Sequence, residues 1–127
     1  MTRSRLVAAL VAALVEAGGV PLAAHHNAAP LFDQTKTIEL EGTVKVWRLS
    51  NPHPLLILDA ANEKGEKVEC GVSFGNAAGT ALRRRGWTPE TLKVGEVVTA
   101  KGNPARAADV CGIDSAVLTR ADGRPVP

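Results

Sequence analysis

Aromatic side chains are scarce in this 127-residue sequence, which has two Trp, two Phe and no Tyr. Barrel proteins that bind single-stranded nucleic acid need exposed rings for base stacking and a strongly basic groove. Here Phe74 and Trp87 are expected in the core, and the formal net charge is only +2. The composition therefore argues against nucleic-acid binding.

Recognisable catalytic motifs are missing as well, because the chain has no glycine-rich phosphate loop and no nucleophile motif. Ser50 and Ser73 have no identifiable base beside them. Asp59, Glu69 and Asp114 cannot be paired as an acid and a base from the sequence alone. We therefore expect a binding protein rather than an enzyme.

No apolar run is long enough to cross a membrane. The longest uninterrupted one covers residues 6–15, whereas a membrane-spanning helix needs about 20 residues. Two arginines precede this run, and Leu22 and Ala24 occupy the positions that a signal peptidase reads. Residues 1–24 are therefore predicted to be a cleaved secretory signal peptide. The mature protein would then be periplasmic or secreted, with no integral membrane segment.

Removal of residues 1–24 leaves 103 residues with 13 basic and 12 acidic side chains, a net charge of +1. This length suits one domain with one modest core. The balanced charge gives no reason to expect binding to nucleic acid or to an anionic membrane.

Only two cysteines are present, Cys70 and Cys111, and both lie in the exported part. An oxidising compartment favours a disulfide between them. The bond would close a 41-residue separation, worth about 4 kcal/mol in the chain-entropy account. Two buried thiols are the alternative, and a thiolate metal ligand is a third possibility that lacks Cys-x-x-Cys spacing.

Alternation of apolar and polar residues predicts five strands, with one helix after the third. The strands are expected at residues 37–46, 55–60, 67–74, 96–101 and 110–119, and the helix at 77–85. Gly42 suggests a bend or bulge in the first strand. Asn76 is the expected N-cap of the helix and Gly86 its expected stop. This order predicts an all-β fold, a small five-stranded OB-like Greek-key barrel, with an open sandwich as the alternative.

The mature chain divides into three parts in this interpretation. Residues 25–35 have no clear period and are expected to form an extended arm. Residues 36–122 form the barrel, in which Cys70 and Cys111 both face inward. Residues 123–127 form a C-terminal tail that is expected to be frayed.

The candidate metal ligands are the three histidines, His25, His26 and His53. If cleavage follows Ala24, His25 offers its α-amine and Nδ1 to one metal ion. His53, on a turn with two prolines, supplies a third nitrogen, and His26 is the rival ligand. Such a histidine brace suits copper, with zinc as the alternative. The opposing interpretation is a solvated N-terminus and a His53 that hydrogen-bonds within its turn.

Two further features adjoin this turn or the helix. Trp47 and Asn51 could line the site of His53, although Trp47 could instead pack under the N-terminal arm. The run Arg83-Arg84-Arg85 could bind an anion or an acidic partner. It could equally be a solvated helix end that interacts with the helix dipole.

Four short segments form a specific combination, although each alone is weak. They are Ala24-His25-His26, Asn51-Pro52-His53, the Leu-Arg-Arg-x-Gly-Trp segment at 82–87, and Asp122-Gly123-Arg124. Together they resemble a family of bacterial exported proteins, domain-of-unknown-function family 6152. The resemblance implies a compact β domain similar to an OB barrel, and the family has no settled activity.

The chain departs from that family pattern in two places. It has Asn27-Ala28 where members have Ser-Phe, and Pro54-Leu55 where members have an aromatic residue. The cysteine pair is not part of the pattern. The sequence thus predicts an exported barrel that binds or handles copper, in contact with metal-handling or envelope proteins. The alternative is a periplasmic module that binds a protein or small ligand and has no metal site.

Overall fold

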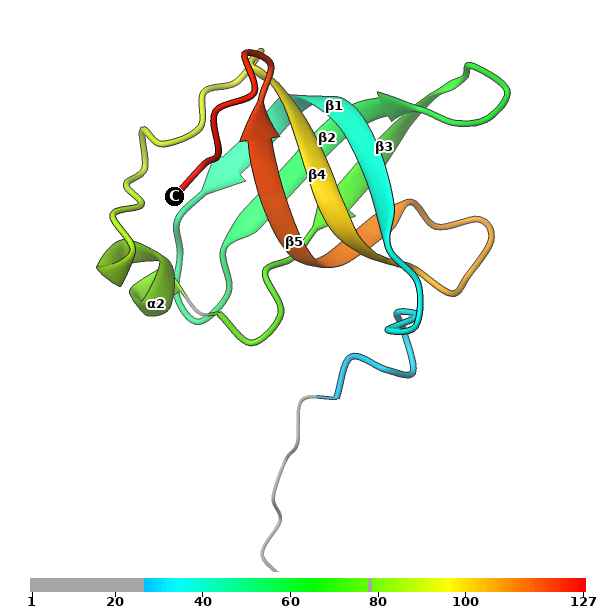
Figure 1. Ribbon diagram of the computed structural model, residues 1–127, viewed down its shortest axis with the longest axis horizontal. Helices are drawn as coiled ribbons and strands as arrows, with labels where there is room; N and C mark the ends of the chain where they lie inside the picture. Colours follow the sequence, from blue (N-terminus) through cyan, green and yellow to red (C-terminus); the bar gives the residue numbers. More distant parts are fainter. Residues whose placement is uncertain (1–26, 78) are drawn as a thin grey trace, which may run out of the picture.

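The computed structural model describes residues 27–77 and 79–127. Five strands form a closed barrel in the order β1-β2-β3-β5-β4 (Figure 1). Their bounds are β1 Ile38–Arg48, β2 Leu55–Ala61, β3 Lys67–Val72, β4 Val97–Pro104 and β5 Gly112–Arg120. The six-residue helix α2, Gly79–Arg84, lies between β3 and β4 in the chain. The predicted small all-β barrel with one short helix is therefore confirmed.

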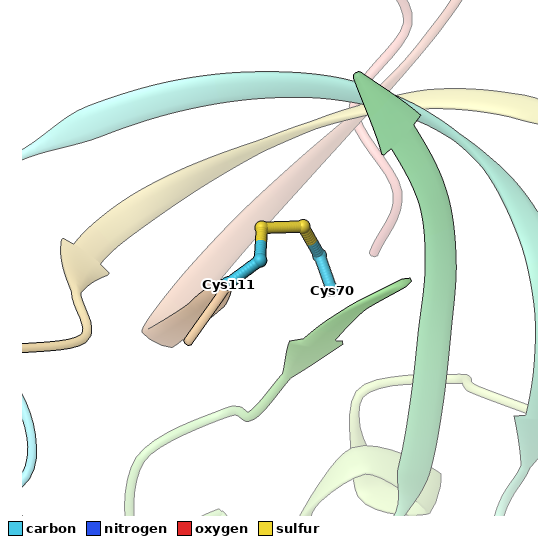
Figure 2. Close-up of a disulfide and its surroundings, with 2 residues drawn as sticks. All are labelled: Cys70 and Cys111. Atoms are coloured by element: carbon cyan, nitrogen blue, oxygen red, sulfur yellow. A yellow bond between two sulfur atoms is a disulfide. The ribbon is translucent and has the colours of Figure 1, made fainter. Parts of the chain in front are cut away.

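The barrel closes through one short parallel pairing. β1 pairs antiparallel with both β2 and β4, whereas β3 and β5 meet only at Gly71 opposite Gly112 and Val72 opposite Ile113. The predicted disulfide between Cys70 and Cys111 lies beside this junction, with Cα atoms 4.6 Å apart (Figure 2). Few ladder hydrogen bonds are available there, so the covalent bond reinforces the weakest junction of the barrel.

Alternate residues of the strands fill the barrel interior, as the period of two predicts. Cys70 is fully buried, while Cys111 precedes β5 and is half-buried. The largest fully buried side chains come from all five strands and from α2: Leu56, Leu58, Leu82, Ile113, Leu118, Val44, Val98 and Cys70. No helix in the described residues is long and apolar enough to span a membrane.

The irregularity in β1 lies at Lys45 and not at Gly42, where we expected it. Val44 is opposite Leu58, but Val46 is opposite Ile57, so one extra residue is inserted between them. Gly42 is needed for a different reason, since a Cβ there would lie 2.9 Å from the Cβ of Leu58. Beyond the bulge the inward and outward faces of the strand exchange.

Several predicted boundaries are wrong by two or three residues. The third strand ends at Val72, the helix is shorter than 77–85, and the fifth strand begins at Gly112. Residues 102–104, beyond the predicted end of the fourth strand at 101, belong to β4, because Gly102 allows close crossing of β4 and β5. A Cβ at this glycine would lie 2.4 Å from the carbonyl oxygen of Asp114.

The C-terminal tail is ordered, so the prediction that it frays is wrong. Its Val126 is buried, and the Val126 amide donates to the Leu118 carbonyl at 3.0 Å. Pro125 forms a bridge with Thr119. The tail therefore extends the sheet along β5 and contributes one apolar side chain to the core.

The described part of the arm is fixed to the β4–β5 loop. The Asp33 amide donates to the Pro104 carbonyl at 2.9 Å, and the Arg106 amide donates to the Leu31 carbonyl at 2.9 Å. Phe32 forms an isolated bridge with Ala105. These bonds hold the arm against the barrel before β1 begins.

Candidate functional site

The turn between β1 and β2, residues 49–54, carries the one candidate metal ligand that the structure describes. His53 is exposed there, between Pro52 and Pro54, and the Asn51–Pro52 peptide bond is cis. The Ser50 hydroxyl donates to the carbonyl oxygen of His53 at 2.9 Å. The backbone that carries the imidazole is therefore constrained from both sides.

Asn51 joins this turn to α2. Its side-chain oxygen accepts hydrogen bonds from the amide of Thr80 at 2.9 Å and from the Thr80 hydroxyl at 3.2 Å. Asn51 thus caps the first turn of the helix from a distant part of the chain. Asn76, the predicted cap, makes no such bond in the described part of the chain. Asn51 therefore has a structural role as the cap of α2. Its possible role in lining the site of His53 stays a prediction.

The C-terminal end of α2 is fixed to the same turn. Nη2 of Arg83 donates to the Leu49 carbonyl at 2.7 Å. Gly86 has a φ of 93°, its amide donates to the Arg83 carbonyl at 3.0 Å, and the Trp87 amide donates to the Leu82 carbonyl at 3.1 Å. This is the Schellman arrangement, and it confirms Gly86 as the helix stop.

Trp47 packs against the core, because the bulge at Lys45 shifts the side-chain parity of β1. Its possible place beside His53 stays a prediction. The ring centroid lies 5.3 Å from that of Trp87 and 6.3 Å from that of Phe74. Trp47 therefore packs in an aromatic cluster beneath α2, and its Nε1 donates to the Thr88 carbonyl at 3.4 Å.

The structure describes only one of the three predicted histidine ligands, His53. His25 and His26 lie outside the described residues. Within residues 27–77 and 79–127 no group of three or more His, Cys, Asp or Glu side chains could hold a metal ion. Cys70 and Cys111 are joined to each other and are not thiolate ligands.

A buried Ser–Asp pair was not identified from the sequence. Asp114 is only 5% exposed and accepts a hydrogen bond from the hydroxyl of Ser73. The Ser115 hydroxyl also donates to it, at 3.2 Å, from a backbone with a φ of 54°. The sequence signal for this pair was Asp114, an acidic residue within the predicted fifth strand. Both serine hydroxyls donate to the side chain of Asp114. This buried polar side chain therefore has its hydrogen-bond partners beside the β3–β5 junction.

A polar hollow of about 380 Å³ lies beside the start of the C-terminal tail. It is lined by Glu90, Thr91, Lys93, Glu96, Arg120 and Arg124. The Arg120 guanidinium pairs with the Glu96 carboxylate and donates to the Thr91 carbonyl at 2.9 Å. Arg124 pairs with Asp122, and the lining includes charges of both signs, so the hollow shows no net preference for a cation or an anion.

Two of the segments that carry the family resemblance, Asn51-Pro52-His53 and residues 82–87, meet at α2, whereas Ala24-His25-His26 lies outside the described residues. Asn51 caps the helix, Arg83 ties it to the turn, and Trp87 donates to the Pro127 carbonyl of the tail. Comparison with curated proteins gave no match. Residues 12–115 match DUF6152, a family of unknown function. The chain therefore belongs to the DUF6152 family.

Proposed function

We propose that this protein is an exported binding protein that holds one copper ion through His25 and His53, with His26 as a further ligand. It would bind or handle copper and carry out no catalytic step. Zinc is the alternative ion, since imidazole also suits zinc.

The observation that carries the proposal is the setting of His53. Its imidazole is exposed, while its backbone is held by two prolines and by the Ser50 hydroxyl. The Asn51 bonds to Thr80 then fix the whole turn to α2. A ligand held in this way loses little conformational freedom when it binds a metal ion.

The path of the arm is a second support. Nε of Arg106 donates to the Ala29 carbonyl at 2.7 Å, so the chain is anchored four residues after His25. Four residues span at most about 14 Å, which limits how far the α-amine can be from this anchor. In the view of Figure 1 the arm and the 49–54 turn both lie on the lower side of the barrel.

Export is part of the proposal because the brace requires a new N-terminus at His25. The apolar run at 6–15 and the disulfide are both compatible with an exported protein. An N-terminal histidine then supplies two nitrogens, and His53 supplies the third.

Copper titration of the processed protein tests the proposal. We expect one Cu(II) per chain, and we expect an affinity that rises with pH because an α-amine with a pKa of about 8 must lose its proton. His53→Ala should weaken binding on the order of tenfold or more, since loss even of an outer partner of a ligand has that effect. Lys64→Ala, on the β2–β3 hairpin, is the matched control and should bind as the native chain does.

The position of the N-terminus gives the sharper comparison. A protein with one extra residue before His25 has the same imidazoles but a displaced amine. It should bind copper more weakly than the processed chain by a similar factor. Equal affinities of the two proteins would exclude the brace.

A further inference from the structure

The surface around α2 is basic. Arg83 and Arg84 form the end of the helix and Arg85 follows directly, and all three are exposed. We call these three residues the α2 basic surface. Arg48 ends β1 one residue before Leu49, whose carbonyl accepts the hydrogen bond from Arg83. Arg48 therefore adds a fourth guanidinium at the end of β1, next in sequence to the residue that Arg83 contacts.

Most of the other lysines and arginines in the described residues pair with carboxylates, and Lys64 and Lys93 are the exceptions. Seven lysine and arginine side chains form ion pairs: Lys36, Lys45, Lys67, Lys101, Arg106, Arg120 and Arg124. In the part of the chain that the structure describes, neither Arg48 nor any residue of the α2 basic surface has such a pair. Of the six lysines and arginines without an ion pair in the described residues, four are therefore Arg48 and the α2 basic surface.

The sequence around this surface contains no acidic residue. Segments 46–58 and 70–89, which form the turn, the helix and their flanks, have neither Asp nor Glu. Two of the three acids that border them are already engaged, since Asp59 lies 3.3 Å from the ammonium of Lys67 and Glu69 pairs with Lys45. The third, Glu90, follows the second segment directly. The helix dipole of six residues favours cations at this end, but it does not require three of them.

We propose that the α2 basic surface binds an acidic segment of a partner protein. A guanidinium presents several N–H donors in a planar fork that matches a carboxylate, and arginine is enriched in protein interfaces. Arg83 is held by the Leu49 carbonyl and fixes the backbone of the helix end. Arg84 and Arg85 then project as the recognition pair.

Two other polyanions fit the observations less well. Single-stranded nucleic acid requires exposed rings, whereas Trp47, Phe74 and Trp87 pack against one another beneath the helix. A membrane surface favours basic residues beside bulky apolar ones that insert. The exposed helix residues beside the arginines are only Thr80 and Ala81.

The test uses the processed protein in the presence of a chelator, so that its outcome does not depend on the copper proposal. The probe is a fluorescent poly-glutamate peptide, and a poly-glutamine peptide of the same length is its control. We expect saturable binding of the acidic peptide that weakens as salt is raised. Arg84→Glu/Arg85→Glu should weaken it about tenfold or more, because two attractive pairs become repulsive.

The matched variant is Lys64→Glu/Lys93→Glu, which changes the net charge equally at two other exposed sites. It should alter the affinity by about threefold at most, since screening limits distant charges. Equal weakening by both variants would show a net-charge effect and overturn the proposal, as would native binding in the arginine variant. Binding to phosphatidylglycerol vesicles, but not to the peptide, would also overturn it and assign the surface to lipid.

Discussion

The side-chain oxygen of Asn51 lies 2.9 Å from the backbone nitrogen of Thr80, 29 residues away in the sequence. This hydrogen bond caps α2 with a residue from the turn that carries His53. The proposed metal ligand and the α2 basic surface are therefore parts of one rigid unit. Loss of the cap should affect both.

We expect Asn51→Ala to lower the free energy of unfolding by about 1 kcal/mol, the usual effect of removing an N-cap acceptor. Asn51→Asp keeps an oxygen at the position and should retain most of the stability. Chemical denaturation of the two variants measures the difference. Equal stability of Asn51→Ala and the native chain would show that the cap contributes nothing.

Much of the barrel could be predicted from sequence because it depends on local pattern. Alternation located all five strands, and the inward parity of Cys70 agreed with its burial. The bulge at Lys45 could not be located this way, since it depends on how β1 meets both β2 and β4. That single residue turns Trp47 toward the core, a position that strand parity did not predict.

The candidate site was predictable only in part for a similar reason. The Asn-Pro-His turn was identified, but its contact with α2 joins segments far apart in sequence. Asn76 had the right residue type for a cap, but the helix begins three residues later, at Gly79, and Asn51 caps it through tertiary structure. Gly102 fell outside the predicted fourth strand, because nothing local indicates that Asp114 crosses it so closely.

Gly79→Ala should destabilise the protein, although alanine favours a helix by about 1 kcal/mol over glycine. The added Cβ would lie 2.3 Å from the Ser50 carbonyl oxygen and would push the turn away from the helix. Overpacking of this kind costs about 1–3 kcal/mol, which outweighs the gain in propensity. Gly71→Ala is the control, because a Cβ there meets nothing within 4 Å. Thermal unfolding of both variants decides the point.

Trp87→Ala should lower the free energy of unfolding by about 3–5 kcal/mol, as for other large aromatic residues removed from a core. The ring is only 4% exposed and lies 5.3 Å from those of Trp47 and Phe74. Its Nε1 also donates to the Pro127 carbonyl. Trp87→Phe should retain part of the packing, so its stability should lie between that of the native chain and that of Trp87→Ala. Tryptophan fluorescence of the variants reports Trp47 directly, and an unchanged spectrum would contradict the ring contact.

Removal of the disulfide should destabilise the barrel by about 4 kcal/mol, the effect expected for a loop of this length. Cys70→Ala/Cys111→Ala gives the protein without the bond, and reduction of the native chain should lower its melting temperature similarly. The double variant should not respond to reductant. Hydrogen exchange should increase most at the Gly71 and Ser73 amides, which donate to the carbonyls of Cys111 and Ile113 across the β3–β5 junction. Uniform acceleration over the whole barrel would contradict a local role.

Acid should loosen the attachment of the arm through Asp33. Hydrogen bonds from the Thr35 hydroxyl and then its amide, with smaller contributions from Arg106 and Lys36, hold the pKa of Asp33 below its ordinary value of 3.8. The unfolded chain therefore binds a proton more readily than the folded one, so this contribution to stability is present above pH 3.8 and is lost as pH falls through the lowered pKa. NMR titration of the Asp33 carboxyl should give a midpoint below 3.8. Thr35→Val removes the largest cause and should move that midpoint upward, whereas an unchanged midpoint would show that the hydroxyl does not set the pKa.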